Sequence, residues 1–184
     1  MELKYSQLFA ISCGLGLQAF TLVLLNAFIP ILAGADVIWV AFQAWAMYFL
    51  AGCTLMGGIR AFIGYAIGIA ASIVIIELMG APGINNLPML DFGVGMNLAM
   101  AVAVFIVVVP AIMTEKLKVM IPAVFVGSGA FFGLTELSGG AEKMGWELHM
   151  AVTRAELVYC AVGLLFGCIT VFWRGMYEAS LSKK

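Results

Sequence analysis

Glu77 is the residue whose type and position could carry chemistry inside a membrane. It stands in the run IVIIELMG (residues 73–80), near the outer end of an apolar segment, and we take it as the ionisable candidate at membrane depth. An ionisable group in the bilayer is costly and by default marks a proton or ion pathway. Two interpretations stay open: Glu77 carries a proton or attracts a cation within the membrane, or it lies at the interface, where its cost is small.

Neutral polar side chains in the same apolar segments could line a solute pathway. Each of them has a simpler interpretation as an interhelical hydrogen bond, which contributes about 0.6 kcal/mol in membrane proteins. The pathway candidates beside Glu77 are Gln43, Asn97, Gln18, Tyr65 and Tyr159. A lone histidine, His149, offers a proton acceptor in a polar stretch near the outer side.

Motifs of enzymes and metalloproteins are absent from the sequence. One histidine and four dispersed cysteines match none of the familiar zinc or iron–sulfur spacings. The sequence contains no nucleotide-binding loop, no Gly-x-Ser-x-Gly and no His-Glu-x-x-His. We therefore expect no metal, no cofactor and no enzymatic activity.

The composition identifies lipid as the expected solvent of these side chains. The chain has 184 residues, of which 64% are hydrophobic and 10% charged, and its mean hydropathy is +1.12. A soluble domain is typically about 45–50% apolar and about 25% charged. The net charge of −1 gives no basic surface for nucleic acid, so we expect the lipid bilayer to be the main partner and nucleic acid not to be one.

Six apolar segments are long enough to cross a bilayer, which takes about 20 mostly apolar residues. The sequence thus predicts an all-α integral membrane protein with one six-helix transmembrane domain over residues 1–184. The expected spans are residues 8–32, 37–56, 61–79, 94–113, 119–137 and 155–173. Residues 57–60 (GGIR) are predicted as a tight turn between the second and third spans. Residues 138–154 are predicted as an outer loop holding a short amphipathic helix, with Met144, Leu148 and Val152 on one face.

The distribution of basic residues predicts the orientation. With six spans, one side holds Lys4, Arg60, Lys116, Lys118, Arg174, Lys183 and Lys184, and the other holds Lys143 and Arg154. Cytoplasmic loops carry the excess of lysine and arginine, so both termini are expected in the cytoplasm. Arg60 is interpreted as a topology marker whose stem reaches the headgroups, or alternatively as a binder of an anionic substrate or lipid.

The acidic residues gather on the opposite side. Asp36, Glu77, Asp91, Glu136, Glu142, Glu147 and Glu156 are assigned to the outer face. An acidic entrance to a pathway on this face would concentrate cations. Alternatively, these carboxylates are simply solvated loop residues.

Small residues recur at helical spacing in three spans. Because lipid gives helices no hydrophobic reason to associate, such stripes are typical of close helix packing, and glycines could also widen a conduit. More than one stripe predicts a homo-oligomer. The packing candidates are Gly64, Gly68, Gly129, Gly133, Gly163 and Gly167.

An overlay at an offset of 95 residues matches Ala66, Gly68 and Gly80 with Ala161, Gly163 and Gly175. Since each half would contain three spans, this overlay predicts two inverted three-helix repeats, an arrangement common in transport proteins.

Three stretches carry a resemblance to a known family: TLMGGIRAF (residues 54–62), IPAVFVGSGAFFG (residues 121–133) and AVGLLFG (residues 161–167). Through them, spans two to six resemble the YcdZ-like bacterial inner-membrane proteins, a family of unknown function. The resemblance implies six spans and the inner (cytoplasmic) membrane of a bacterium. It implies no substrate, and the outer loop 138–154 departs from the family pattern.

The function expected from the chain itself is a membrane channel or facilitator that passes a small neutral or cationic solute without energy coupling. The small size, the lack of energy-coupling motifs and the glycine-rich helices with neutral polar groups favour it. Two alternatives stay open: a proton-coupled secondary transporter with Glu77 as carrier, and a membrane subunit that docks a partner without transporting anything.

Overall fold

The protein is described by a computed structural model that places residues 4–28, 37–90, 96–139 and 145–181; of residues 89, 90, 96 and 97 only the backbone is described. The helices are α1 (Tyr5–Asn26), α2 (Ile38–Leu50), α3 (Leu55–Met79), α4 (Leu98–Met113), the 3-10 turn η1 (Thr114–Leu117), α5 (Ile121–Leu137) and α6 (Trp146–Leu181). Two short strands, β1 (Met89–Leu90) and β2 (Met96–Asn97), pair in antiparallel fashion before α4.

Four of the helices are long and apolar enough to cross a membrane: α1, α3, α4 with η1, and α6. The helices α2 and α5 are apolar but have only 13 and 17 residues. At 1.5 Å per residue they measure about 20 and 26 Å, less than the roughly 30 Å of a bilayer's hydrocarbon core. The prediction of an apolar, helical protein is therefore confirmed, and four of its helices could cross a membrane. The prediction of six spans is not settled by helix length.

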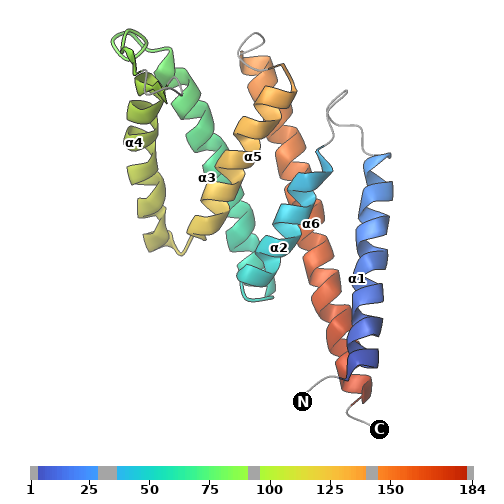
Figure 1. Ribbon diagram of the computed structural model, residues 1–184. Coiled ribbons are helices and arrows are strands. Elements are labelled where there is room, and N and C mark those ends of the chain that lie inside the picture. Colours follow the sequence, from blue (N-terminus) through green and yellow to red (C-terminus); the bar gives the residue numbers. More distant parts are fainter. Residues whose placement is uncertain (1–3, 29–36, 91–95, 140–144, 182–184) are drawn as a thin grey trace.

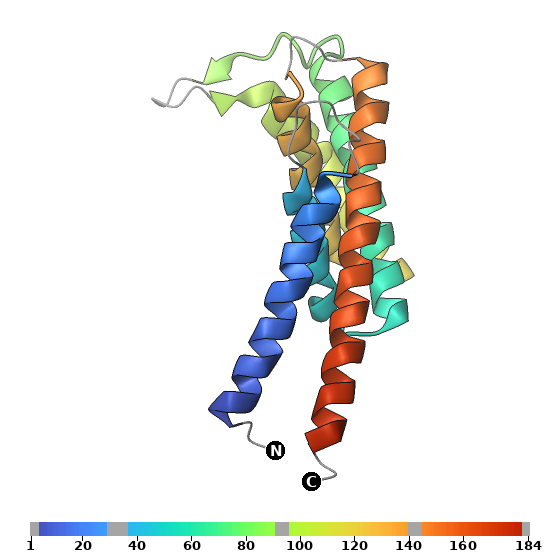
Figure 2. The ribbon, with the colours of Figure 1, turned by 90° about the vertical axis from the view of Figure 1, so that its right-hand side faces the viewer.

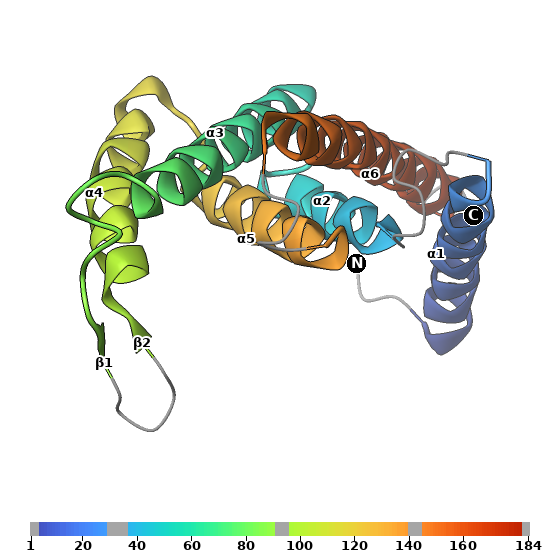
Figure 3. The ribbon, with the colours of Figure 1, turned by 90° about the horizontal axis from the view of Figure 1, so that it is seen from above.

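The helices form a broad row rather than a closed ring (Figures 1 and 3). The most extensive packing joins α3 to α5 and α2 to α6, while α3 also contacts α6 near the middle of the row. Helix α4 packs on α3 at one flank and α1 packs on α6 at the other. Figure 2 shows the start of α1 and the end of α6 at the same end of the molecule.

The chain turns between α2 and α3 at residues 51–54, so the predicted turn at residues 57–60 is wrong. Gly52 and Cys53 adopt positive φ angles of +84° and +57°, the left-handed region that suits a tight turn. Thr54 then caps α3, with its hydroxyl accepting a hydrogen bond from the Gly57 N–H at 3.0 Å. Gly57 and Gly58 belong to α3, where a Cβ on Gly57 would overlap the carbonyl of Ala51.

The glycine stripes of α3 and α6 are used within the protomer. A Cβ on Gly68 would overlap the carbonyl oxygen of Val124 and lie 2.6 Å from the amide nitrogen of Ser128, both on α5. A Cβ on Gly163 would likewise overlap the Ala41 carbonyl on α2. These glycines let two helix backbones touch. Gly64 has the same role against the backbone at the start of α5, whereas Gly167 packs against the Tyr48 side chain of α2.

The two stripe glycines of α5, Gly129 and Gly133, do not touch the backbone of another helix. A Cβ on Gly129 would meet no atom within 4 Å, and one on Gly133 would meet only the Trp39 ring at 3.4 Å. Because Gly68 and Gly167 already pack inside the protomer, replacing them would test the fold rather than assembly. The homo-oligomer stays a prediction, and Gly129 is the stripe residue that remains available for it.

Helix α6 begins at Trp146 and runs unbroken for 36 residues, so the second half of the predicted outer loop is helical. The predicted surface helix is wrong, because Val152 is fully buried and Leu148 packs against the core. Met144 lies outside the described residues. These additional helical turns bring His149 into the bundle, where it becomes a buried titratable side chain.

Candidate functional site

Four polar or ionisable residues follow one face of α6: His149, Thr153, Glu156 and Cys160. Their spacing of i, i+4, i+7 and i+11 places them above one another on the helix. His149 is 1% exposed, and Glu156 and Cys160 are fully buried. We call this set the α6 polar stripe.

The stripe meets α3 near the ends of the two helices. His149 Nδ1 lies 3.7 Å from Glu77 Oε1, and the Glu77 side chain is 68% exposed. The Phe131 ring of α5 packs against the imidazole with its centroid 6.0 Å away. Glu77 thus offers an exposed carboxylate beside a buried histidine, a geometry that can pass a proton or hold a cation between surface and interior.

Deeper in the bundle, Glu156 is surrounded by other groups that hold protons. The Tyr65 hydroxyl of α3 and the Cys160 thiol both lie close enough to interact electrostatically with its carboxylate. Tyr65 is near the middle of α3, which spans residues Leu55–Met79. Glu156 therefore lies beside the middle of one of the helices long enough to cross a membrane.

Most of these groups lack hydrogen-bond partners within the described part of the chain. This holds for both carboxylate oxygens of Glu156, both ring nitrogens of His149, the Thr153 hydroxyl and the Tyr65 hydroxyl. Buried polar groups in proteins are nearly always paired, so such a concentration needs an explanation. An ionised carboxylate without a partner is especially costly in an apolar interior. Glu156 needs a proton or a bound cation.

Helices α3 and α6 run in opposite directions (Figure 1), which orders the groups into a path. Glu77 faces His149 at one end, and Tyr65 faces Glu156 and Cys160 further in. His149 and Glu156 are two helical turns apart, about 10 Å along the axis. A histidine and a threonine on one face of α6 thus lie between the exposed acid Glu77 and the buried acid Glu156, without hydrogen bonds connecting them among the described residues.

Two of the predicted pathway residues, Gln18 and Tyr159, form hydrogen bonds between helices. Thr170 donates a hydrogen bond to Gln18 Oε1 at 2.6 Å, and Tyr159 donates one to Asn26 Oδ1 at 2.5 Å. Both bonds join α1 to α6. Among the other candidates, Tyr65 and Glu77 adjoin the α6 polar stripe, and Gln43 is exposed on α2. The side chain of Asn97 lies outside the described residues.

The Tyr159–Asn26 bond gives a measurable expectation. We expect the double-mutant cycle of Tyr159→Phe and Asn26→Ala to show a coupling of about 0.6 kcal/mol, the average for interhelical hydrogen bonds in membranes. The measurement is thermal unfolding of the detergent-purified protein. Tyr5→Phe is the matched control, since Tyr5 is 93% exposed. A coupling of zero would return Tyr159 to the list of pathway candidates.

Glu156 is the functional candidate that sequence reasoning assigned to the wrong place. The sequence places it among the acids of the outer face, either in a cation-attracting cluster or as a solvated loop residue, whereas the structure shows it fully buried. The i, i+4, i+7, i+11 spacing was the signal that could have found it. Among the described residues, no group of three or more histidine, cysteine or acidic side chains could hold a metal ion.

Comparison with known proteins gives one match. Residues 10–175 match the model of a family described as "Protein of unknown function (DUF1097)". No curated protein and no solved structure matches the chain. The match agrees with the expectation of a family without known function. The YcdZ-like name stays a prediction.

Proposed function

The chain belongs to the DUF1097 family, to which no activity is attached, and we propose from its own residues that it is a small-solute transporter coupled to protons through Glu156. The observation that carries the proposal is the buried, unpaired carboxylate of Glu156 beside the middle of α3. Ionisable groups at such depth are rare and mark proton relays and ion pathways. The solute expected from the neutral polar groups is small and neutral or cationic.

The packing of the helices supports two inverted halves. If α1–α3 and α4–α6 are equivalent, then α2 on α6 corresponds to α5 on α3, and these are the two most extensive helix contacts. The flanking contacts also correspond, since α1 packs on α6 and α4 packs on α3. Gly68 and Gly163, which overlay at the offset of 95 residues, each allow a close approach to the middle helix of the other half. Two halves that rock against each other are a known basis for alternating access.

The short helices also fall in corresponding positions. Helices α2 and α5 are the middle helices of the two halves, and both are shorter than a bilayer is thick. In transporters built from inverted repeats, a pair of short or interrupted helices at equivalent positions marks the substrate site. We therefore place the solute site between α2 and α5, beside the Glu156 carboxylate on α6.

The membrane arrangement of the proposal has six spans, with both termini in the cytoplasm of a bacterium and the protein in its inner membrane. The lysine and arginine distribution supports this orientation. It places Glu77 and His149 near the outer surface and the remainder of the α6 polar stripe further in. Protons would then enter at Glu77 and reach Glu156 from outside.

Liposome flux tests the proposal against its alternatives. The purified protein is reconstituted with a pH-sensitive dye inside, and small neutral and cationic solutes such as urea, glycerol, alanine and putrescine are added outside. A coupled transporter changes the internal pH when its solute is added and accumulates that solute against a gradient when protons flow inward. A passive channel equilibrates the solute without moving protons. A docking subunit moves no solute.

Glu77 provides a second measurement. We expect Glu77→Gln to slow solute-driven proton movement severalfold, because His149 is buried and Glu77 is the exposed carboxylate beside it that can pass protons to it. Glu147→Gln is the control, since Glu147 is an exposed acid in the first turn of α6. Equal rates for the two variants would exclude Glu77 from the proton path.

A further inference from the structure

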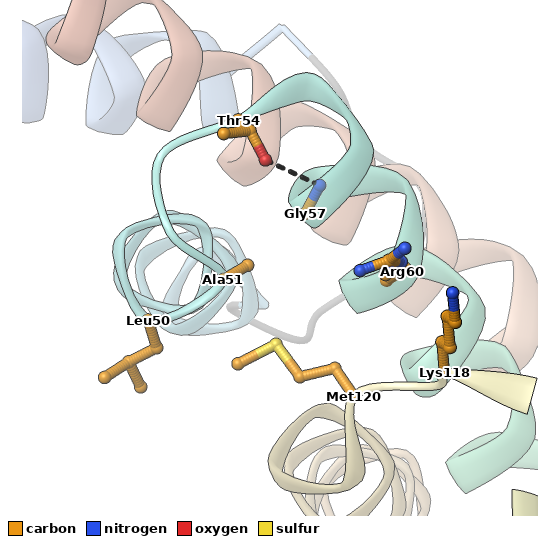
Figure 4. A pocket seen from close by; sticks show the side chains of 7 residues that line it. All are labelled: Leu50, Ala51, Thr54, Gly57, Arg60, Lys118 and Met120. Atoms are coloured by element: carbon orange, nitrogen blue, oxygen red, sulfur yellow. Dashed lines mark hydrogen bonds between the residues drawn. The ribbon is translucent and has the colours of Figure 1, made fainter. Parts of the chain in front are cut away.

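A pocket of about 240 Å³ lies where the turn after α2 and the connection before α5 meet the start of α3 (Figure 4). The end of α2 and the residue preceding α5 form one wall, and the first turns of α3 form another. It is lined by Leu50, Ala51, Thr54, Gly57, Arg60, Lys118 and Met120. The pocket lies at the opposite end of α3 from Glu77, so it is separate from the α6 polar stripe.

Two cations from distant parts of the chain line this pocket. Arg60 belongs to α3 and Lys118 follows η1, and both side chains border the same space in Figure 4. Neither makes a salt bridge or a side-chain hydrogen bond within the described part of the chain. Two positive charges near one another repel unless an anion lies between them. The arrangement is thus favourable to an anionic ligand.

The other walls limit what that anion can be. Leu50, Ala51 and Met120 are apolar. The Thr54 hydroxyl accepts the Gly57 N–H, as the dashed line in Figure 4 shows, and its own hydrogen can still be donated, so Thr54 adds a neutral donor to the two charged side chains. Drug-sized ligands occupy pockets of roughly 300–1,000 Å³, whereas this pocket suits one small charged group with a short apolar attachment.

We propose that this pocket binds the phosphate group of a phosphate ester, held by Arg60 and Lys118. The planar guanidinium of arginine matches two phosphate oxygens at once, and the lysine adds a point charge. The phosphate belongs either to an anionic lipid headgroup, with the ester carbons along Leu50 and Met120, or to a soluble phosphate compound. This inference does not depend on proton coupling or on the identity of the transported solute.

Calorimetric titration of the detergent-purified protein tests the site with three defined probes: dihexanoyl phosphatidic acid, inorganic phosphate and dihexanoyl phosphatidylcholine. We expect phosphatidic acid to bind, and Arg60→Gln and Lys118→Gln each to weaken that binding about tenfold, as expected for loss of a charge-assisted hydrogen bond. Lys116→Gln is the matched control, because it removes a neighbouring charge that does not line the pocket. Binding of the wild-type protein should also weaken with added salt.

The probes distinguish the sources of the phosphate. Binding of phosphatidic acid alone supports a lipid site, and binding of inorganic phosphate with the same dependence on Arg60 and Lys118 supports a soluble phosphate ligand. Binding of phosphatidic acid to Arg60→Gln and Lys118→Gln with wild-type affinity overturns the proposal, as does an equal loss in Lys116→Gln. If Arg60→Gln does not fold, Arg60→Lys takes its place: it keeps the charge but loses the planar guanidinium, so we expect a partial loss of affinity, and wild-type affinity in this variant together with Lys118→Gln overturns the proposal. No binding of any probe to the wild-type protein also overturns it.

Discussion

Glu156→Gln is expected to reduce solute-driven proton movement to the level of protein-free liposomes while the protein stays folded. Glutamine keeps the shape of the side chain but cannot release a proton, so a transporter that relies on this carboxylate loses its coupling. Solute exchange between two equal pools needs no net proton transfer and should persist. The measurement is internal pH on solute addition, together with exchange of labelled solute.

The stability of this variant separates a functional role from a structural one. Both carboxylate oxygens of Glu156 lack hydrogen-bond partners among the described residues, so the neutral amide removes no bond that the structure shows. The unfolding temperature should therefore stay level or rise. Glu136→Gln, at an exposed acid near the end of α5, serves as the control. Wild-type proton movement in Glu156→Gln would contradict the proposed mechanism.

Gly68→Ala is expected to destabilise the fold by more than about 2 kcal/mol, since overpacking a tight contact typically costs 1–3 kcal/mol. The added Cβ would overlap the backbone of α5 at Val124, and a backbone carbonyl cannot rotate away as a side chain can. In a protein of this size the change corresponds to a fall in unfolding temperature of roughly 4–8 °C. The check is thermal unfolding in detergent, followed by yield of folded protein.

Gly16→Ala, in α1, is the matched control for this prediction. A Cβ at that position meets no atom within 4 Å, and alanine favours a helix over glycine by about 1 kcal/mol. The control should be neutral or slightly stabilising. If both variants unfold at the same temperature, close contact between α3 and α5 at Gly68 is not what stabilises the bundle.

The helical class of the fold was predictable because apolar runs of about 20 residues have few alternatives in lipid. The ends of the helices were harder to place. Gly57 and Gly58 look like turn residues in the sequence, yet they belong to α3, where a Cβ would overlap the Ala51 carbonyl at Gly57 and crowd the Tyr48 ring at Gly58. Sequence alone does not distinguish these two uses, since both depend on what lies opposite the residue.

The start of α6 was misplaced for a related reason. The residues before Ala155 are polar enough to resemble a loop, and a hydropathy pattern reports the solvent of each residue rather than its backbone conformation. His149 and Glu156 are buried by α3 and α5, which come from elsewhere in the chain. From the sequence alone, only the position of these two residues on one helix face could be predicted. The sequence predicts Tyr65 as a pathway candidate, but only the fold shows that Glu156 is its neighbour.

The packing of α2 on α6 also has a consequence for how the protein is made. Ala41 touches Gly163, roughly 120 residues further along the chain, and translation at about 5–20 residues per second separates them by some 6–24 s. During that interval α2, a helix of 13 residues, has no partner for its principal packing face. The nascent chain therefore carries α2 without its main packing partner until α6 has been made.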